Sequence, residues 1–323
     1  MNKRAVVTGA GGFIGHHLVS YLKQCDYWVR GVDLKQPEYE SSKADEMLLL
    51  DLREFENCLE ATKDMEEVYN LAADMGGIGY ITAFHATIAR NNTLINSHML
   101  ESSRLNNVSR FLYSSSACVY PGYKQELADV TPLKEEDAYP ADPEEGYGWE
   151  KLFTEKMCQY YTEDHGLETR VVRFHNVYGP LGTYDGGKEK APAALSRKIA
   201  LVEDGGQIEV WGDGDQTRSF MYIDDCVEGI FRIMQSSYRW PLNLGTDRMV
   251  TINELIEIIS AIAQKQVHKV HDLSKPQGVR GRNSDNTILN EIIGWAPSID
   301  LEEGLEPTYN WILNELSAAG QKV

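Results

Sequence analysis

Short runs of apolar residues alternate with longer, more polar segments through the first half of the chain. The short runs are rich in β-branched residues and predict strands. In the longer segments apolar residues recur every three or four positions, as Ile14, Leu18 and Leu22 do, which predicts helices. The expected strands cover 4–8, 28–33, 67–71, 109–114 and 168–173, and the helices after the first cover about 54–62, 85–106 and 147–164. Strands that alternate with helices favour an α/β fold with a doubly wound parallel sheet.

The pattern changes after about residue 175. Residues 179–192 are rich in glycine and lysine, which is typical of a loop. Thr251 and Glu254 have the spacing of a capping box in front of a helix. The other expected elements are a helix at 192–203, strands at 207–211 and 242–244, helices at 252–264 and about 301–318, a polar basic loop at 272–285 and a short helix that ends at Gly294. These few strands indicate a smaller lobe rather than a second doubly wound domain.

The composition is that of an ordinary globular protein, with 42% hydrophobic and 25% charged residues among 323. A net charge of −18 argues against nucleic-acid binding, which requires a basic surface. No run approaches the roughly 20 apolar residues of a membrane span, and the N-terminus does not resemble a signal peptide. The five scattered cysteines show no CxxC spacing, so we expect no disulfide framework, no metal site and a cytoplasmic location. An anionic ligand would require a local cluster of arginine and lysine.

Residues 8–15, TGAGGFIG, lie between the first predicted strand and helix. Gly9, Gly12 and Gly15 have the spacing that allows a tight turn, close approach of a pyrophosphate and helix–strand packing. Asp33 ends the second predicted strand, where a carboxylate accepts hydrogen bonds from a ribose and repels a 2′-phosphate. A turn without a ligand is the alternative. The context favours a dinucleotide site that prefers NAD, although Lys35 nearby softens the discrimination against NADP.

Tyr147 and Lys151 are four residues apart and therefore share one helical face. We expect the lysine charge, together with that of the nicotinamide, to move the pKa of the phenol toward neutrality, so that Tyr147 can act as a base. Ser116 ends another predicted strand and can hydrogen-bond the same substrate hydroxyl. Tyrosine and lysine at this spacing are also common on exposed helices, but the glycine turn and the serine favour a catalytic group.

Together these elements resemble the extended short-chain dehydrogenase/reductase family, and further matching segments lie at 51–52, 70–73, 176–180, 211–214 and 216–220. The resemblance implies that Asn176 and Arg218 hold the diphosphate of a nucleotide sugar. It also implies the cofactor contacts Phe13, Ile14, Asp51, Leu52, Leu71, Ala72 and Ala73. The Rossmann domain that binds NAD is expected to span 1–175 plus about 219–245. The nucleotide-sugar lobe would then span about 176–218 plus 246–323.

Within this family the chain resembles the group of GDP-mannose 3,5-epimerases, through segments 72–80, 115–121, 173–194 and 278–286. Oxidising the hexose C4 hydroxyl to a ketone acidifies the hydrogens at C3 and C5, so epimerisation needs one group to remove a proton and another to return it. The resemblance implies Cys118 as the base and Lys190 as the acid, with GDP-L-galactose or GDP-L-gulose as products. We expect cationic surroundings to favour the Cys118 thiolate. Otherwise an isolated cysteine is usually a small apolar residue, and a lone loop lysine is usually solvated.

The positive residues that an anionic substrate requires lie in the second half. Arg218, Arg280 and Arg282 could chelate a diphosphate, with help from Lys198. Ion pairs of Arg280 and Arg282 with Asp272 and Asp285 are the alternative. Other expected substrate contacts are Met75, Gly76 and Gly77 in a turn after the fourth strand, together with Ser116, Glu189, Ala191 and Gln216.

Two alternative functions are also compatible with the sequence. A GDP-4-keto-6-deoxymannose epimerase–reductase also has a cysteine two residues after its serine, but it consumes NADPH, which Asp33 disfavours. A Rossmann module without catalysis would bind NAD but has no use for Ser116, Tyr147 and Lys151 together. The family resemblance also implies a homodimer, formed through the helices near 85–106 and 147–164 as a four-helix bundle.

Overall fold

The computed structural model describes residues 2–76, 78–275 and 278–323. A seven-stranded sheet with the strand order β11-β6-β5-β4-β1-β2-β3 organises most of the chain, and every strand pair in it is parallel. Its strands are β1 (Arg4–Thr8), β2 (Trp28–Asp33), β3 (Glu46–Leu49), β4 (Glu67–Asn70), β5 (Arg110–Ser116), β6 (Glu168–Phe174) and β11 (Leu242–Leu244). The predicted doubly wound α/β fold is confirmed.

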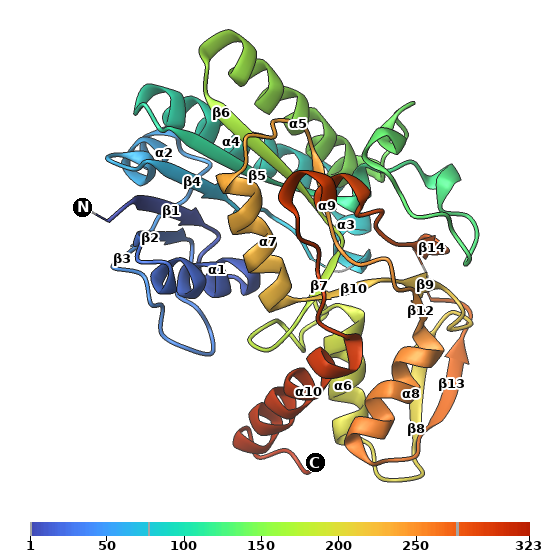
Figure 1. Ribbon diagram of the computed structural model, residues 1–323. Helices are drawn as coiled ribbons and strands as arrows, with labels where there is room; N and C mark the ends of the chain where they lie inside the picture. The colour runs from blue at the N-terminus through green and yellow to red at the C-terminus, as the bar shows by residue number, and fades with distance from the viewer. Residues whose placement is uncertain (1, 77, 276–277) are drawn as a thin grey trace.

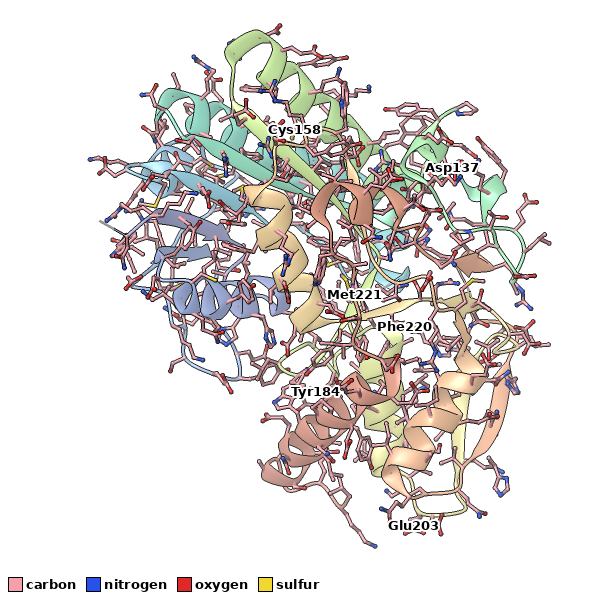
Figure 2. The ribbon with its side chains drawn as sticks, viewed as in Figure 1. Asp137, Cys158, Tyr184, Glu203, Phe220 and Met221 are labelled. Atoms are coloured by element: carbon pink, nitrogen blue, oxygen red, sulfur yellow. The ribbon has the colours of Figure 1, made fainter. Side chains whose placement is uncertain are left out.

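Helices cover both faces of this sheet (Figure 1). One face carries α1 (Phe13–Gln24), α7 (Ile223–Gln235) and α9 (Thr287–Ile293). The other face carries α2 (Phe55–Thr62), α4 (His85–Leu105) and α5 (Glu145–His165). Cys158 is fully buried between α5 and the sheet (Figure 2). Burial on both faces explains why the strands read as continuous apolar runs.

A smaller lobe lies below the sheet in Figure 1, where α6 (Ala191–Leu201), α8 (Ile252–Ala263) and α10 (Leu301–Ala318) enclose their own apolar cluster. Thr251 and Glu254 form the predicted capping box: the Glu254 amide donates to Thr251 Oγ1 over 3.0 Å, and the Thr251 amide donates to Glu254 Oε2 over 2.7 Å. Among the described residues, no helix is both long and apolar enough to cross a bilayer.

The other strands form small sheets of their own. The pairs are β7 (Asn176–Tyr178) with β10 (Phe220–Tyr222), β8 (Gln207–Trp211) with β13 (His268–Asp272), and β9 (Thr217–Arg218) with both β12 (Val250–Thr251) and β14 (Gly281–Arg282). In β10 the side chain of Met221 belongs to the sheet's apolar cluster, whereas that of Phe220 belongs to the lobe's cluster (Figure 2). Because neighbouring residues of a strand point to opposite sides, one strand couples the two cores.

The elements predicted in the first half lie within two residues of their expected bounds, but β3 and the short helix α3 (Ile78–Ala83) were not predicted. In the second half the sequence reading missed α7 and most of the short strands. The segment 272–285, expected to be a loop, contains β14, which carries Arg282 into the interior. The remaining elements are the 3₁₀ turns η1 (Ala117–Val119), η2 (Gly122–Lys124) and η3 (Glu135–Ala138).

Candidate active site

The glycine turn connects β1 to α1, and two of its glycines are there for steric reasons. Gly9 has φ +71°, a left-handed conformation that side chains disfavour. A Cβ on Gly15 would overlap the Gly9 carbonyl oxygen. Gly12 is the N-cap of α1 and supplies no side chain to cap it. The first amides of the helix therefore stay available, and such amides bind phosphate groups.

Position 11 must also be glycine, because it has no room for a side chain. The sequence analysis did not predict this. A Cβ there would overlap the Lys35 carbonyl oxygen. The close approach lets the Gly11 amide donate to Asp33 Oδ2 over 2.9 Å, while the Leu34 amide donates to Asp33 Oδ1 over 2.6 Å. Lys35 forms an exposed ion pair with Glu38 at 3.3 Å. The turn and the predicted ribose-binding carboxylate are thus one unit.

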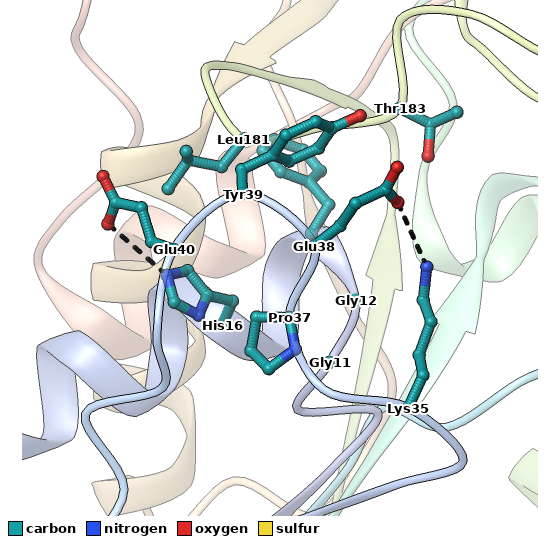
Figure 3. Close-up of a pocket in the computed structure, with 11 residues that line it drawn as sticks. Gly11, Gly12, His16, Lys35, Pro37, Glu38, Tyr39, Glu40, Leu181 and Thr183 are labelled. Carbon is teal, nitrogen blue, oxygen red and sulfur yellow. Dashed lines mark hydrogen bonds and ion pairs between the residues drawn. The ribbon is translucent and has the colours of Figure 1, made fainter.

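A pocket opens beside this turn (Figure 3). Gly11, Gly12 and Phe13 form one side of it, and the strap of residues 35–40 forms another. The strap reaches the smaller lobe through Tyr39, whose ring packs edge-on against Trp311 with 4.9 Å between centroids. A cradle without side chains, uncapped helix amides and an adjacent carboxylate fit the pyrophosphate and ribose of NAD.

The other residues expected at the cofactor surround this turn in different ways. The Leu71 and Ala72 backbone amides each donate a hydrogen bond to Thr8 Oγ1 over 3.1 Å, which fixes the end of β4 against the glycine turn. Asp51 accepts hydrogen bonds from the Arg53 guanidinium, and these hold the pKa of Asp51 below its usual value. The remaining expected residues are the buried Leu52 and the half-buried Phe13, Ile14 and Ala73.

Tyr147 and Lys151 lie on the buried face of α5, near Ser116 at the end of β5. The Lys151 ammonium donates to the Ser114 carbonyl oxygen over 2.8 Å and lies 5.5 Å from the centroid of the Tyr147 ring. The Ser116 hydroxyl is close enough to the Tyr147 phenol to oppose the rise in its pKa. The structure therefore brings together the three residues that the sequence reading grouped.

The electrostatics of this group differ from the expectation. Burial raises the pKa of Tyr147 well above its usual value, and Cys118 and Glu150 add to the effect. Burial also lowers the pKa of Lys151, although the Glu150 carboxylate opposes this. The expectation combined the charges of the lysine and the nicotinamide. Within the protein itself, desolvation outweighs the lysine charge, because both groups are almost completely enclosed.

A chain of buried polar side chains connects the glycine turn with α5. Thr8 Oγ1 donates to Asn70 Oδ1 over 2.9 Å, and the Asn70 amide donates to Asn96 Oδ1 over 2.8 Å. The Asn96 amide then donates to Glu150 Oε1 over 2.6 Å. Glu150 directly precedes Lys151 in the sequence. The chain therefore fixes the catalytic helix relative to the expected cofactor site, since buried polar groups hold their partners in defined geometry.

Cys118 lies in η1, two residues after Ser116, and its amide donates to Ser116 Oγ over 3.2 Å. The thiol packs with Tyr147 and with Ile88 of α4. Burial raises the pKa of the thiol to about 11, helped by Glu144 and opposed by Arg282. We expected cationic surroundings to favour the thiolate. The cation is present, but desolvation and a carboxylate outweigh it.

Lys190 precedes α6 and faces the same region from the lobe. Desolvation lowers the pKa of its ammonium from the usual value, while Cys118 and Cys226 act in the opposite direction. The residue still keeps an exposed surface, so protein surrounds it without closing off solvent. Among the described residues no hydrogen bond holds its ammonium group, which is thus available to donate a proton.

The expected cationic residues divide into two groups. Arg282 Nη1 lies 3.8 Å from Cys118 Sγ, and Arg218 is close enough that burial and Arg282 lower its pKa to about 10. In contrast, Arg280 pairs with Asp213 at 2.7 Å, and Lys198 donates to the Glu209 carbonyl oxygen over 2.9 Å. The ion pairs considered in the sequence analysis, with Asp272 and Asp285, are not the ones formed by Arg280 and Arg282.

The remaining expected substrate residues lie in varied environments. Asn176 donates to the Ser219 carbonyl oxygen over 3.0 Å, and Gln216 donates to the Trp211 carbonyl oxygen over 3.1 Å. Met75 is exposed, and a Cβ on Gly76 would overlap Tyr80. Glu189 accepts from the Gly187 amide, and Ala191 begins α6. Gly77 lies outside the described residues.

Three side chains near the thiol were missed by the sequence reading. Glu144 forms an ion pair with Arg282, and Gln125 Oε1 accepts from Arg282 Nε over 2.5 Å. Tyr80 packs against the cluster of Cys118 and Tyr147, and the Lys188 ammonium lies 4.1 Å from the centroid of its ring. Local sequence offers no signal for these contacts, because residues far apart in the chain make them.

A parallel sheet with this glycine turn, beside a buried tyrosine, lysine and serine, is the framework of a nucleotide-dependent oxidoreductase or epimerase. The model of the NAD dependent epimerase/dehydratase family matches residues 5–245, and the chain belongs to this family. Membership confirms NAD as the cofactor and confirms the predicted class of enzyme.

Within this family, the chain is more similar to some proteins than to others. GDP-mannose 3,5-epimerase 1 from Oryza sativa subsp. indica is 50% identical over 315 residues, which are 97% of this chain and 82% of the relative. This match confirms the resemblance predicted from the sequence. GDP-L-fucose synthase from Escherichia coli (strain K12) is 28% identical over 96% of this chain and 97% of the relative. Among solved structures, UDP-glucose 4-epimerase with UDP-glucose from Thermotoga maritima has a TM-score of 0.88 and 27% identity, covering 97% of this chain and 99% of that chain.

Proposed function

We propose that this chain is a GDP-mannose 3,5-epimerase, which inverts C3 and C5 of the hexose to give GDP-L-galactose, GDP-L-gulose or both. The observation that carries the proposal is a thiol placed beside the buried tyrosine. Cys118 packs against Tyr147 and shares Ser116 with it, while Lys190 approaches from the lobe. Oxidation and reduction alone would need only the tyrosine, lysine and serine. The added thiol and ammonium supply two groups for proton transfer at carbon.

The residues around the glycine turn would hold the cofactor. The amides at the start of α1 would bind the pyrophosphate, Asp33 the adenosine ribose and Lys151 the nicotinamide ribose. Asp51 and Leu52 would contact the adenine. When bound, NAD supplies the acceptor for the hydride that leaves C4 and returns it at the end of the cycle.

Tyr147 is the acid–base group for the C4 hydroxyl. It takes the hydroxyl proton as the ketone forms and gives it back when the hydroxyl is restored. Ser116, whose hydroxyl lies near Tyr147, orients the same hydroxyl. The charge of Lys151 favours the phenolate, against the burial that raises the pKa of Tyr147. Tyr147 and Lys151 are both buried, which limits the access of water to the ketone.

Cys118 and Lys190 carry out the inversions. The Cys118 thiolate removes the proton from the carbon next to the ketone, so the carbon–hydrogen bond breaks, an S–H bond forms and the electron pair delocalises into an enolate. The Lys190 ammonium then gives a proton to the opposite face of that carbon. The lowered pKa of Lys190 makes it a better acid than an ordinary lysine.

The substrate's negative charge calls for local cations in a chain whose net charge is −18. Arg282 lies 3.8 Å from the thiol, and Arg218 is near Arg282, so we assign both to the diphosphate or hexose. Arg280 and Lys198 are engaged by Asp213 and Glu209 and would have to exchange these partners. The division into a sheet domain for NAD and a lobe for the nucleotide sugar follows from these assignments.

We also propose a homodimer. Three large apolar side chains on α5 recur at helical spacing and are about half exposed: Trp149, Phe153 and Tyr160. An apolar stripe on a long surface helix is typical of a helix-bundle interface.

The five free cysteines are compatible with a reducing cytoplasm, which we propose as the location.

The test is the identity of the products formed from GDP-mannose by the NAD-loaded enzyme with no NADPH present. We expect NMR spectra to show the C5 or the C3 and C5 epimers at an equilibrium ratio. Stoichiometric consumption of NADPH with a GDP-4-keto-6-deoxymannose substrate, and no conversion of GDP-mannose, would instead assign the chain to the fucose-synthase type.

A further inference from the structure

Glu144 directly precedes α5, and its side chain faces the candidate active site. Its backbone amide donates to the Cys118 carbonyl oxygen over 2.9 Å, which ties the start of the helix to η1. Its carboxylate forms an ion pair with Arg282 Nη2. Although Glu144 is the N-cap residue, its side chain makes no capping hydrogen bond to the helix. The carboxylate is therefore engaged by Arg282 and not by the first amides of the helix.

The partner of Glu144 is held on three sides. Arg282 Nε donates to Gln125 Oε1 over 2.5 Å, Nη1 lies 3.8 Å from Cys118 Sγ, and Nη2 contacts Glu144. Gln125 is itself buried, and its carbonyl oxygen accepts from the Arg280 amide over 2.9 Å, which fixes the start of β14. The guanidinium therefore cannot approach or leave the sulfur freely, because each of its nitrogens has a defined partner.

The thiol consequently lies between opposite charges. The titratable groups that face it come from every element packed around it: Tyr80 of α3, Glu144 at the start of α5, Tyr147 and Lys151 of α5, Lys190 at α6, Arg218 of β9 and Arg282 of β14. Glu144 is the carboxylate in this set, and its charge raises the pKa of the Cys118 thiol. A negative charge at that place disfavours the thiolate, whereas Arg282 favours it.

A structural role alone would explain the ion pair, since it connects α5 with β14. Two observations argue for more. The Glu144 carboxylate is close enough to the thiol to raise its pKa, besides pairing with the arginine. Moreover, the Glu144 side chain is partly exposed, whereas Cys118 is buried.

We propose that Glu144 is a positioning residue for proton transfer: its carboxylate holds the Arg282 guanidinium beside the Cys118 sulfur and keeps that sulfur protonated in the enzyme without substrate. The role of Glu144 in catalysis rests on the proposed epimerase function. The protonated sulfur is protected from oxidation and alkylation, because the thiolate is the reactive form.

The substitution Glu144→Gln tests the proposal because it removes the charge and keeps the shape. The amide oxygen can still accept from Arg282, while the thiolate loses a repelling neighbour. We expect the pKa of the thiol to fall by about one unit. At a fixed pH of about 8, alkylation of Cys118 by iodoacetamide should then be about three- to fivefold faster, once the lower nucleophilicity of a more acidic thiolate is included.

The measurement is the alkylation rate of Cys118 in the NAD-loaded enzyme, followed by mass spectrometry of its peptide. Glu145→Gln is the matched control, because Glu145 is the exposed neighbour of Glu144 and carries the same charge. Its rate should equal that of the wild type. Glu144→Asp retains the charge and should also stay close to the wild type. Arg282→Gln leaves Glu144 facing the thiol and should slow alkylation, which keeps the proposal testable if Glu144→Gln does not fold.

An unchanged rate in Glu144→Gln, or an equal acceleration in Glu145→Gln, would overturn the proposal. Alkylation requires no turnover, so this result is independent of whether GDP-mannose is a substrate. With substrate, the pH profile of solvent deuterium exchange in Glu144→Gln should shift to lower pH. A purely structural ion pair would reduce the rate at every pH and leave the profile in place.

Discussion

The glycine turn and the surroundings of Cys118 are two sites built on different principles. The turn is made by backbone: Gly9, Gly11 and Gly15 are required by close approach, and consecutive residues supply the binding amides. The thiol site is made by side chains from several elements, with Glu144 and Arg282 balancing charge around it. The first should therefore be sensitive to volume, and the second to charge and to the identity of a single atom.

The largest effect is expected from Cys118→Ala, which removes the proposed base and little volume. Loss of a positioned acid–base group lowers rates by about 10²–10⁴-fold. We expect this loss in the exchange of sugar hydrogens with solvent, whereas bound NAD, measured by absorbance after release, should be unchanged. Cys158→Ala is the control, because that thiol is buried in the sheet's apolar core away from the site. Wild-type exchange in Cys118→Ala would refute the assignment of the base.

The next effect is expected from Gly15→Ala, which tests the sensitivity of the turn to volume. The added methyl group would overlap the Gly9 carbonyl oxygen, and overpacking of this kind costs about 1–3 kcal/mol of unfolding free energy. The displaced turn should also lose NAD. Gly122→Ala is the control, since a Cβ there meets open space and the backbone needs no positive φ. Urea unfolding and NAD content measure both effects, and equal stability of the two variants would contradict this account.

A smaller effect is expected from Asp33→Asn, which changes charge at the turn without adding volume. A hydrogen bond to a charged group contributes about 1.5–3 kcal/mol, so NAD should bind roughly ten- to a hundredfold more weakly. NADP should lose less, because the repulsion of its 2′-phosphate also disappears. Titration with both cofactors measures the ratio. Glu38→Gln, at the exposed partner of Lys35, should leave that ratio almost unchanged.

The same contrast explains what could be predicted from the sequence. The residues of the turn are consecutive, and Asp33 ends the neighbouring strand, so local spacing was enough to place them. The expected positions of Ser116, Tyr147 and Lys151 followed from a strand end and a helical interval. The chain also formed the predicted α4 and α5 with only small differences at their ends.

The thiol site escaped prediction because its contacts are long-range. Arg282 and Glu144 are separated by 138 residues, and β14 has only two residues, paired with an equally short β9. So short a strand has no recognisable period. The lowered acidity of Cys118 and Tyr147 depends on burial, which the presence of nearby cations in the sequence does not reveal. Glu144 itself stands beside Glu145 with nothing local to distinguish them.

The central claim is that a ketone at C4 lets Cys118 and Lys190 exchange protons at the neighbouring ring carbons. Its most direct test is to incubate the NAD-loaded enzyme with GDP-mannose in deuterated water and to locate deuterium by NMR. The account predicts deuterium at C5, at C3 or at both, without net oxidation of the sugar. Epimers or unchanged substrate whose C3 and C5 carry only the original hydrogens would contradict it.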